Sequence, residues 1–238
     1  MIQPTQPEVP PPAAPLQQLL DSAVYEAHFA ANVSVDGPAL CLTVYSSEAP
    51  FDRTVDAAAA WMTSTGIDGT AACTETGSVV LTVATAEAVH QLIAVLLDPY
   101  IRARTTATQM ADLLQAHDLA GGSTVTLGAH AIEVTLADDD LDAAIGFAAL
   151  LGAPGIDAGL DLSRPEGLLG LADRIKWLTT GVIGSEIYAS ADPGCAHAPE
   201  QITLQLTIEQ ARALLQRHAR FSNSPAAHPE GGNGAQPA

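Results

Sequence analysis

The same order of predicted elements occurs twice along this chain, and this weak internal repeat limits the folds that are open to it. Each copy has the pattern of an apolar strand, a helix, two further strands and a second helix. In the first copy these patterns cover residues 39–45, 52–65, 71–75 and 79–83, and then a helix from Thr85. In the second copy they cover residues 131–136, 139–151, 182–189 and 202–206, and then a helix from Thr207. The repeat predicts two lobes of similar architecture.

The clearest correspondence joins the last strand of each copy to the helix that follows it. Every second residue is apolar in both strands, at Val79, Leu81 and Val83 and at Ile202, Leu204 and Leu206. A threonine cap follows each strand, at Thr85 and Thr207, with a glutamate two residues later. Strand-into-helix junctions are common in α+β proteins, so chance similarity stays an alternative to duplication.

A further strand precedes each copy and is expected to form a hairpin with its first strand. Residues 25–35 lead through Asp36-Gly37 into residue 39, and Asp-Gly between apolar runs is a strong hairpin signal. Residues 124–127 lead in the same way through Gly128 into residue 131. Each lobe then has the order ββαββα, which is one four-stranded antiparallel sheet with two helices. The predicted fold class is α+β.

Helix signals also predict how the two lobes are joined. Thr106 and Gln109 form a capping box, which makes residues 105–119 a connecting helix. Ser163 as N-cap, followed by Pro165 and Glu166, predicts a helical insertion within residues 155–180. The first lobe is accordingly expected at residues 16–104, and the second at residues 120–221.

The two ends of the chain have compositions that favour disorder. Residues 1–15 contain six prolines, which favour an extended polyproline conformation and leave little to bury. Residues 222–238 are rich in glycine and proline and poor in apolar side chains. Both segments are predicted to be disordered.

Charge and composition exclude some classes of partner. The net charge of -18 and the pI near 4.4 argue against binding to nucleic acid or to anionic membranes, because no basic stripe is present to neutralise phosphates. Hydrophobic residues make up 47% of the chain, enough for a core, although only 4% are aromatic. Lys176 is the only lysine, a bias that resembles proteins from GC-rich genomes such as those of actinobacteria.

Cysteine usage and targeting signals point to the cytoplasm. Cys41, Cys73 and Cys195 are odd in number and widely spaced, which favours reduced thiols over a disulfide framework. The N-terminus has neither the basic nor the apolar segment of a signal peptide, and no apolar run approaches the length of a membrane span. A cytoplasmic protein that does not insert into membranes is expected.

Four carboxylates crowd the start of a predicted helix, at Asp138, Asp139, Asp140 and Asp142. Oxygen ligands of this kind hold hard divalent cations, so the cluster is a candidate metal site. The glycine and the spacing of an EF-hand loop are absent. The alternative is that these acids cap the helix and interact with its positive N-terminal end.

A second candidate metal site lies in a turn that contains Asp192, Cys195 and His197. Zinc accepts carboxylate, thiolate and imidazole ligands, but a closed site needs a fourth ligand that the sequence does not supply nearby. The alternative is that these are ordinary residues of a hairpin loop, with Cys195 the most exposed of the three cysteines.

Motifs for phosphate binding, dinucleotide binding, nucleophilic serine and zinc hydrolysis are all missing. No catalytic residue and no cofactor is therefore predicted. The leading hypothesis is a non-catalytic binding or regulatory protein that acts through contacts with a protein or a small ligand. The alternatives are a metal-dependent enzyme that uses one of the two clusters, and a self-assembling structural module such as a homodimer.

Overall fold

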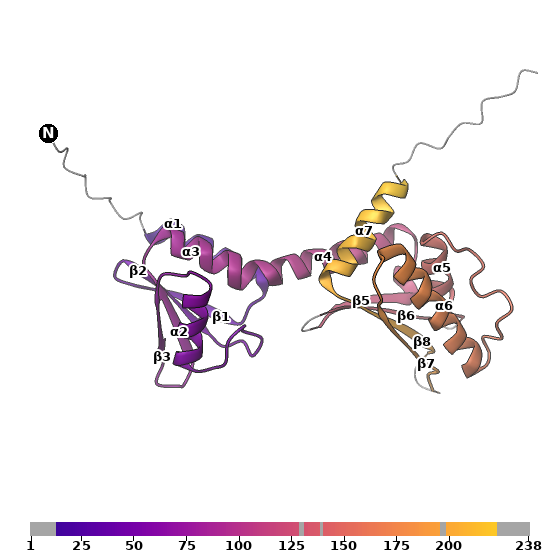
Figure 1. Ribbon diagram of the computed structural model, residues 1–238, viewed down its shortest axis with the longest axis horizontal. Coiled ribbons are helices and arrows are strands. Elements are labelled where there is room, and N and C mark those ends of the chain that lie inside the picture. Colours follow the sequence, from indigo (N-terminus) through magenta and orange to yellow (C-terminus); the bar gives the residue numbers. More distant parts are fainter. Residues whose placement is uncertain (1–12, 129–130, 139, 196–198, 223–238) are drawn as a thin grey trace, which may run out of the picture. The chain divides into compact units, whose positions relative to one another are not determined.

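The computed structural model describes residues 13–128, 131–138, 140–195 and 199–222. The chain divides into two compact units, unit 1 at residues 1–106 and unit 2 at residues 107–238 (Figure 1). Each unit contains one four-stranded antiparallel sheet with helices packed on it. The predicted α+β fold, with two lobes of ββαββα order, is therefore confirmed.

Unit 1 is built on a sheet with the strand order β1-β2-β4-β3. Its strands are β1 (Ala31–Asp36), β2 (Ala39–Val44), β3 (Thr70–Cys73) and β4 (Val79–Val83). Its helices are α1 (Ala13–Ala27), α2 (Val55–Ser64) and α3 (Ala86–Leu92). The predicted hairpin is present, with Gly37 at the positive φ of 58° that its turn requires.

The core of unit 1 lies on one face of this sheet. Buried and partly exposed residues alternate along β2 and β4, which is the pattern of strands covered on a single side. Leu42 lies opposite Leu81 at the centre of the sheet, and both side chains are fully buried. Helices α1, α2 and α3 supply the other side of this core, with Leu20, Met62 and Leu92.

Helix α1 was not expected from the sequence, which predicts a strand from Tyr25 and a disordered lead-in as far as residue 15. The structure places residues 13–27 in one helix, so only residues 1–12 of that lead-in lie outside the described residues. Leu16, Leu20, Ala23 and Ala27 share one helical face and pack in the core. Alanine is only weakly apolar, so this stripe gives the sequence no clear helical period.

A long helical stretch leads from unit 1 into unit 2. Helix α3 passes through a π-helical turn, Ile93–Leu97, into α4 (Asp98–Ala116), and the boundary between the units falls within α4. The predicted helix start at Thr106 is wrong, because its hydroxyl donates to the carbonyl of Arg102 in the preceding turn (2.7 Å). A threonine with this local hydrogen bond sits in a helix interior and does not cap it.

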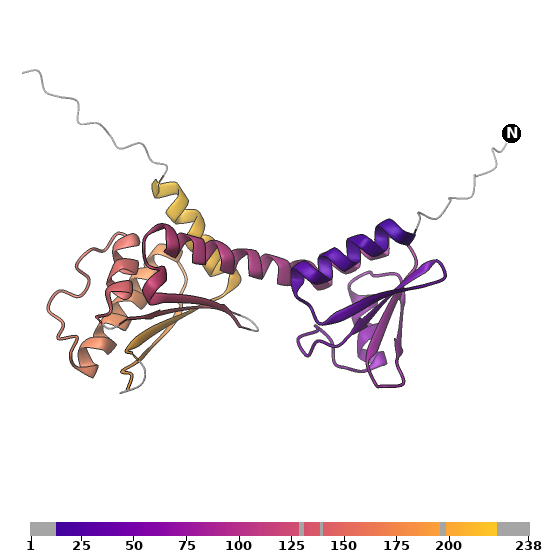
Figure 2. The ribbon, with the colours of Figure 1, turned by 180° about the vertical axis from the view of Figure 1, so that it is seen from behind.

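Unit 2 repeats the sheet of unit 1 with the strand order β5-β6-β8-β7 (Figure 2). Its strands are β5 (Ser123–Leu127), β6 (Ile132–Ala137), β7 (Tyr188–Asp192) and β8 (Gln201–Leu206), preceded by a 3-10 turn at Ala120–Gly122. Its helices are α5 (Asp142–Leu150), α6 (Pro165–Ile183) and α7 (Ile208–Ser222). Val134 lies opposite Leu204, both fully buried, as Leu42 and Leu81 are in unit 1.

Helix α6 is the predicted insertion, but its ends differ from the prediction. Arg164 is the N-cap residue, and the hydroxyl of Ser163 instead donates to the Asp161 carboxylate (2.6 Å). The helix continues to Ile183 and ends at Gly184, whose φ of 85° closes it. The strand predicted from residue 182 therefore begins only at Tyr188.

Besides helix α1 of unit 1 and the α6 insertion of unit 2, the two units differ in the connection between their second strand and the following helix. In unit 2, residues 138–141 join β6 to α5, whereas in unit 1 the much longer loop 45–54 joins β2 to α2. Long ordered loops on a rigid sheet are common places for binding sites. None of the helices in the described part of the chain is both long enough and apolar enough to cross a membrane.

Candidate functional site

Aromatic residues gather around loop 45–54 of unit 1. The chain has four phenylalanines, four tyrosines and two tryptophans. Five of these ten lie in the loop or support it: Tyr45 and Phe51 belong to the loop, Trp61 packs on Phe51, Tyr100 bonds to the loop, and Phe29 packs behind Tyr100. Half of a scarce residue type is thus concentrated at one loop.

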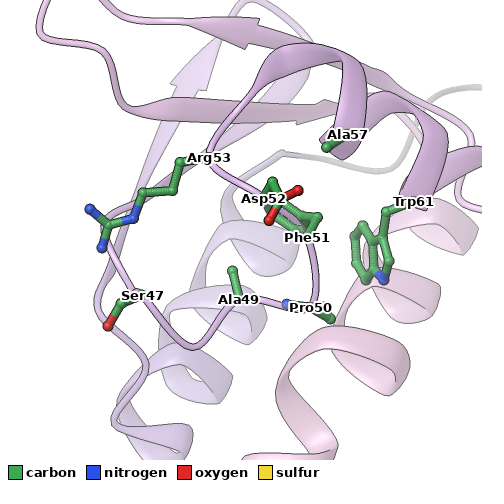
Figure 3. A pocket seen from close by; sticks show the side chains of 8 residues that line it. All are labelled: Ser47, Ala49, Pro50, Phe51, Asp52, Arg53, Ala57 and Trp61. Atoms are coloured by element: carbon green, nitrogen blue, oxygen red, sulfur yellow. The ribbon is translucent and has the colours of Figure 1, made fainter.

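The loop and the start of α2 enclose an open pocket of about 500 Å³, which we call the aromatic pocket. Its lining residues are Ser47, Ala49, Pro50, Phe51, Asp52, Arg53, Ala57 and Trp61 (Figure 3). The rings of Phe51 and Trp61 are 5.1 Å apart between centroids and tilted by 45°. Both rings are partly buried and rest on the core of unit 1, so they form a fixed wall.

Several hydrogen bonds within unit 1 hold the loop in place. The Thr54 side chain caps α2 by accepting from the Ala57 amide (3.2 Å). The Arg53 guanidinium donates to the carbonyl of Tyr45, which ties the end of the loop to its beginning (3.2 Å). The middle of the loop is held from α4, where the Tyr100 hydroxyl donates to the Glu48 carbonyl.

Tyr100 is suited to this anchoring role. Its ring packs on Phe29 at 5.2 Å between centroids. Burial raises the pKa of Tyr100 above its usual value, and the nearby Glu48 carboxylate raises this pKa further. The hydroxyl therefore keeps its proton and remains a donor across the neutral range.

Arg53 also lines a second, smaller hollow of about 190 Å³ beside the β3–β4 turn. The residues around this turn hollow are Val44, Tyr45, Arg53, Thr76, Gly77, Ser78 and Val79. The turn is closed by the Thr74 amide, which donates to the Ser78 carbonyl (2.9 Å). Within the described part of the chain, Arg53 forms no ion pair with a carboxylate.

The charge around the aromatic pocket is mainly negative. Glu48 and Asp52 lie in the loop, and Asp56 lies in the first turn of α2; all three are exposed. Arg53 is the one basic residue between residues 45 and 64. The pocket therefore combines an aromatic wall with a carboxylate that lines it and a local excess of negative charge.

The predicted aspartate cluster lies in unit 2, at the start of α5. Asp138 accepts a hydrogen bond from the Ala143 amide (2.8 Å), which is the capping contact that was weighed against metal binding. Asp140 and Asp142 are exposed, and Asp139 lies outside the described residues. The other oxygen of Asp138 is buried and has no partner among the described residues.

The predicted turn with Asp192, Cys195 and His197 follows strand β7. Asp192 accepts from the Gly194 amide (2.9 Å), Cys195 is exposed, and His197 lies outside the described residues. Among the residues that the structure does describe, no three carboxylate, imidazole or thiol groups gather to hold a metal ion. Metal binding at either cluster stays a prediction.

Sequence reasoning missed the aromatic pocket. A signal was present, because Tyr45, Phe51 and Trp61 fall close together in a chain of which only 4% is aromatic. The contributions of Phe29 and Tyr100 could not be seen, since both are distant in sequence from the loop they support.

We compared the chain with protein-family models, with curated protein sequences and with solved structures, and found no match.

Proposed function

We propose that this protein is a non-catalytic binding protein, and that the aromatic pocket of unit 1 holds its ligand. The observation that carries the proposal is the pair of aromatic rings, Phe51 and Trp61, that lines the pocket in a chain of which only 4% is aromatic. Aromatic side chains contribute large contact areas at a small cost in conformational entropy, which makes them effective in recognition. The pocket is an open hollow of about 500 Å³ on the surface of unit 1, so a ligand can reach it directly from solvent.

The lining favours binding over catalysis. Its polar side chains are those of Ser47, Asp52 and Arg53, and none of the described lining residues is a histidine or a cysteine. A serine nucleophile requires an adjacent base, and an acid–base mechanism requires a second titratable group at short range. These residues can orient and select a ligand.

The two tryptophans provide a direct test, because one lies in each unit. Trp61 lines the pocket, whereas Trp177 lies on α6 of unit 2 and is 64% exposed. Their indole N–H signals can be followed by NMR in nitrogen-15-labelled full-length protein and assigned with the Trp61→Phe and Trp177→Phe variants. The probes are acetylated and amidated tripeptides, Gly-X-Gly, in which X is each of the common amino acids in turn.

We expect at least one tripeptide to shift the Trp61 signal in a saturable manner while the Trp177 signal stays in place. Phe51→Ala should weaken this binding, since it removes half of the aromatic wall. If no tripeptide shifts Trp61, or if Trp61 and Trp177 shift together, the proposal is wrong.

Self-assembly through the sheet of unit 1 is a second candidate. Among the described residues, the outer strands β1 and β3 each pair with a strand on one side only. Val35 on β1 is 44% exposed, and such an edge can pair with a second copy. Sedimentation should then show a dimer that Val35→Lys disrupts, whereas a monomer at high protein concentration would exclude this candidate.

A further inference from the structure

We propose that the aromatic pocket binds a cationic side chain, an arginine or a lysine on a basic segment of a partner protein. This inference rests on the proposed function, because it names the chemistry of the ligand that the pocket would hold. It is carried by the aromatic wall, by the carboxylates beside it and by the charge of the whole chain.

The wall offers the surface that a cation prefers. A guanidinium or ammonium group is attracted to the face of an aromatic ring, and tryptophan is the strongest partner of this kind. Trp61 and Phe51 are tilted by 45° relative to one another and are not stacked face to face. Their position on the core keeps the rings in place without a ligand, so little ordering is needed on binding.

The carboxylates near the pocket also favour a positively charged ligand. Asp52 lines the pocket next to Phe51, and Figure 3 shows it between Arg53 and Trp61. Glu48 and Asp56 add two further negative charges near the pocket. Over a longer range, the net charge of -18 attracts basic partners and repels acidic ones.

Arg53 is the one feature of the pocket that would favour an anion. In Figure 3 its guanidinium points away from the ring of Trp61, and one of its nitrogens donates to the Tyr45 carbonyl. It is also shared with the turn hollow on the other side of the loop. The guanidinium is thus engaged with the backbone of the loop and turned away from the aromatic wall at which a cation would bind.

The test uses the full-length protein, with the Trp61 indole signal as its readout. The probes are the arginine and lysine tripeptides, their neutral counterparts with citrulline and acetyl-lysine, the glutamate tripeptide, and the free diamine putrescine. Citrulline is close to arginine in size and has a planar end group, but it carries no charge. We expect the arginine tripeptide to bind about fivefold more tightly than the citrulline one, and raised salt to reduce this difference.

Two variants test which carboxylate attracts the cationic tripeptide. Asp52→Asn should weaken binding of the arginine tripeptide by about two- to fivefold, the range for an exposed ion pair. Asp56→Asn is the matched control, since Asp56 is an exposed acid just beyond the loop, in the first turn of α2, and does not line the pocket. Its effect should be smaller than that of Asp52→Asn.

The outcomes separate this inference from the proposed function. Binding of the neutral or glutamate tripeptides as tight as that of arginine would overturn the cationic ligand but leave the pocket as a binding site. If putrescine, a free diamine, binds more tightly than the basic peptides, the ligand is a small amine and not a partner protein. No shift of Trp61 with any of these probes would overturn the cationic ligand, and the proposed function would fall with it only if the remaining tripeptides also left the Trp61 signal in place.

Discussion

Two glycines of helix α6 should respond in opposite ways to the same substitution. Gly167 is buried in the first turn, and Gly181 is exposed near the other end of the helix. A Cβ atom at Gly167 would lie 2.0 Å from the carbonyl oxygen of Asp161, whereas a Cβ atom at Gly181 meets nothing within 4 Å. The difference arises because the chain ahead of α6 returns closely onto its first turn.

The expected free energies follow from these contacts. Alanine is favoured over glycine in a helix by about 0.5–1 kcal/mol, so Gly181→Ala should raise the free energy of unfolding by up to that amount. Gly167→Ala has the same helical advantage, but the backbone at Asp161 must move by more than about 1 Å. Overpacking of this kind costs about 1–3 kcal/mol, so we expect a net loss of stability.

Urea unfolding followed by circular dichroism measures both variants, and Trp61 fluorescence in a Trp177→Phe background follows unit 1 separately. The Trp61 transition should be unchanged, because both glycines belong to unit 2. Arg174 holds the preceding segment by donating to the carbonyl of Ala158 (3.0 Å), so Arg174→Ala should reduce the cost of Gly167→Ala. A Gly167→Ala variant as stable as Gly181→Ala would refute the described path of this segment.

Three further predictions concern the loop anchor, the core of unit 2 and the cap of α2. The pKa of Tyr100 is raised by burial and by Glu48, so the folded state keeps this proton longer than the unfolded chain does. The resulting stability is present below pH 10.0 and is lost as the pH rises through the folded pKa; a pH series of urea midpoints should show this loss in the native chain but not in Tyr100→Phe. Phe147 is fully buried, and Phe147→Ala should lower the free energy of unfolding by about 3–5 kcal/mol in urea titrations, whereas a change below 1 kcal/mol would contradict its place in the core. Thr54→Ala removes the hydrogen bond from the Ala57 amide and should cost about 1 kcal/mol, seen as an earlier Trp61 fluorescence transition on urea unfolding. An unchanged transition in that variant would show that the cap does not hold α2.

The pattern of residues in the sequence determined the α+β class and the repeated order of elements. Apolar residues recur at every second position of β4 and β8, and these positions are the ones that the structure buries, as at Leu81 and Leu204. This succeeds because a strand with one covered face must place every second side chain in the core. The turn at Gly37 could also be predicted from the sequence, because the residue at this position must adopt a positive φ and glycine does so without strain.

Local signals failed where packing or the continuation of a neighbouring element decided the outcome. Helix α1 forms because Leu20 and its alanine neighbours fill a site on the sheet, although alanine alone marks no clear apolar face. Thr106 and Ser163 both resemble caps, but the first lies inside α4 and the second pairs with Asp161. A cap motif describes four residues and carries no information about the element that precedes it.

The shape of the aromatic pocket is decided by tertiary contacts. The sequence supplies Phe51 and Trp61 in neighbouring segments, so their contact is nearly local. The loop takes its shape from Tyr100 on α4, which reaches Glu48, and from Phe29, which supports the tyrosine ring. Contacts between residues so far apart in the chain depend on how α4 and the sheet pack together, and no pattern of local propensities encodes that packing.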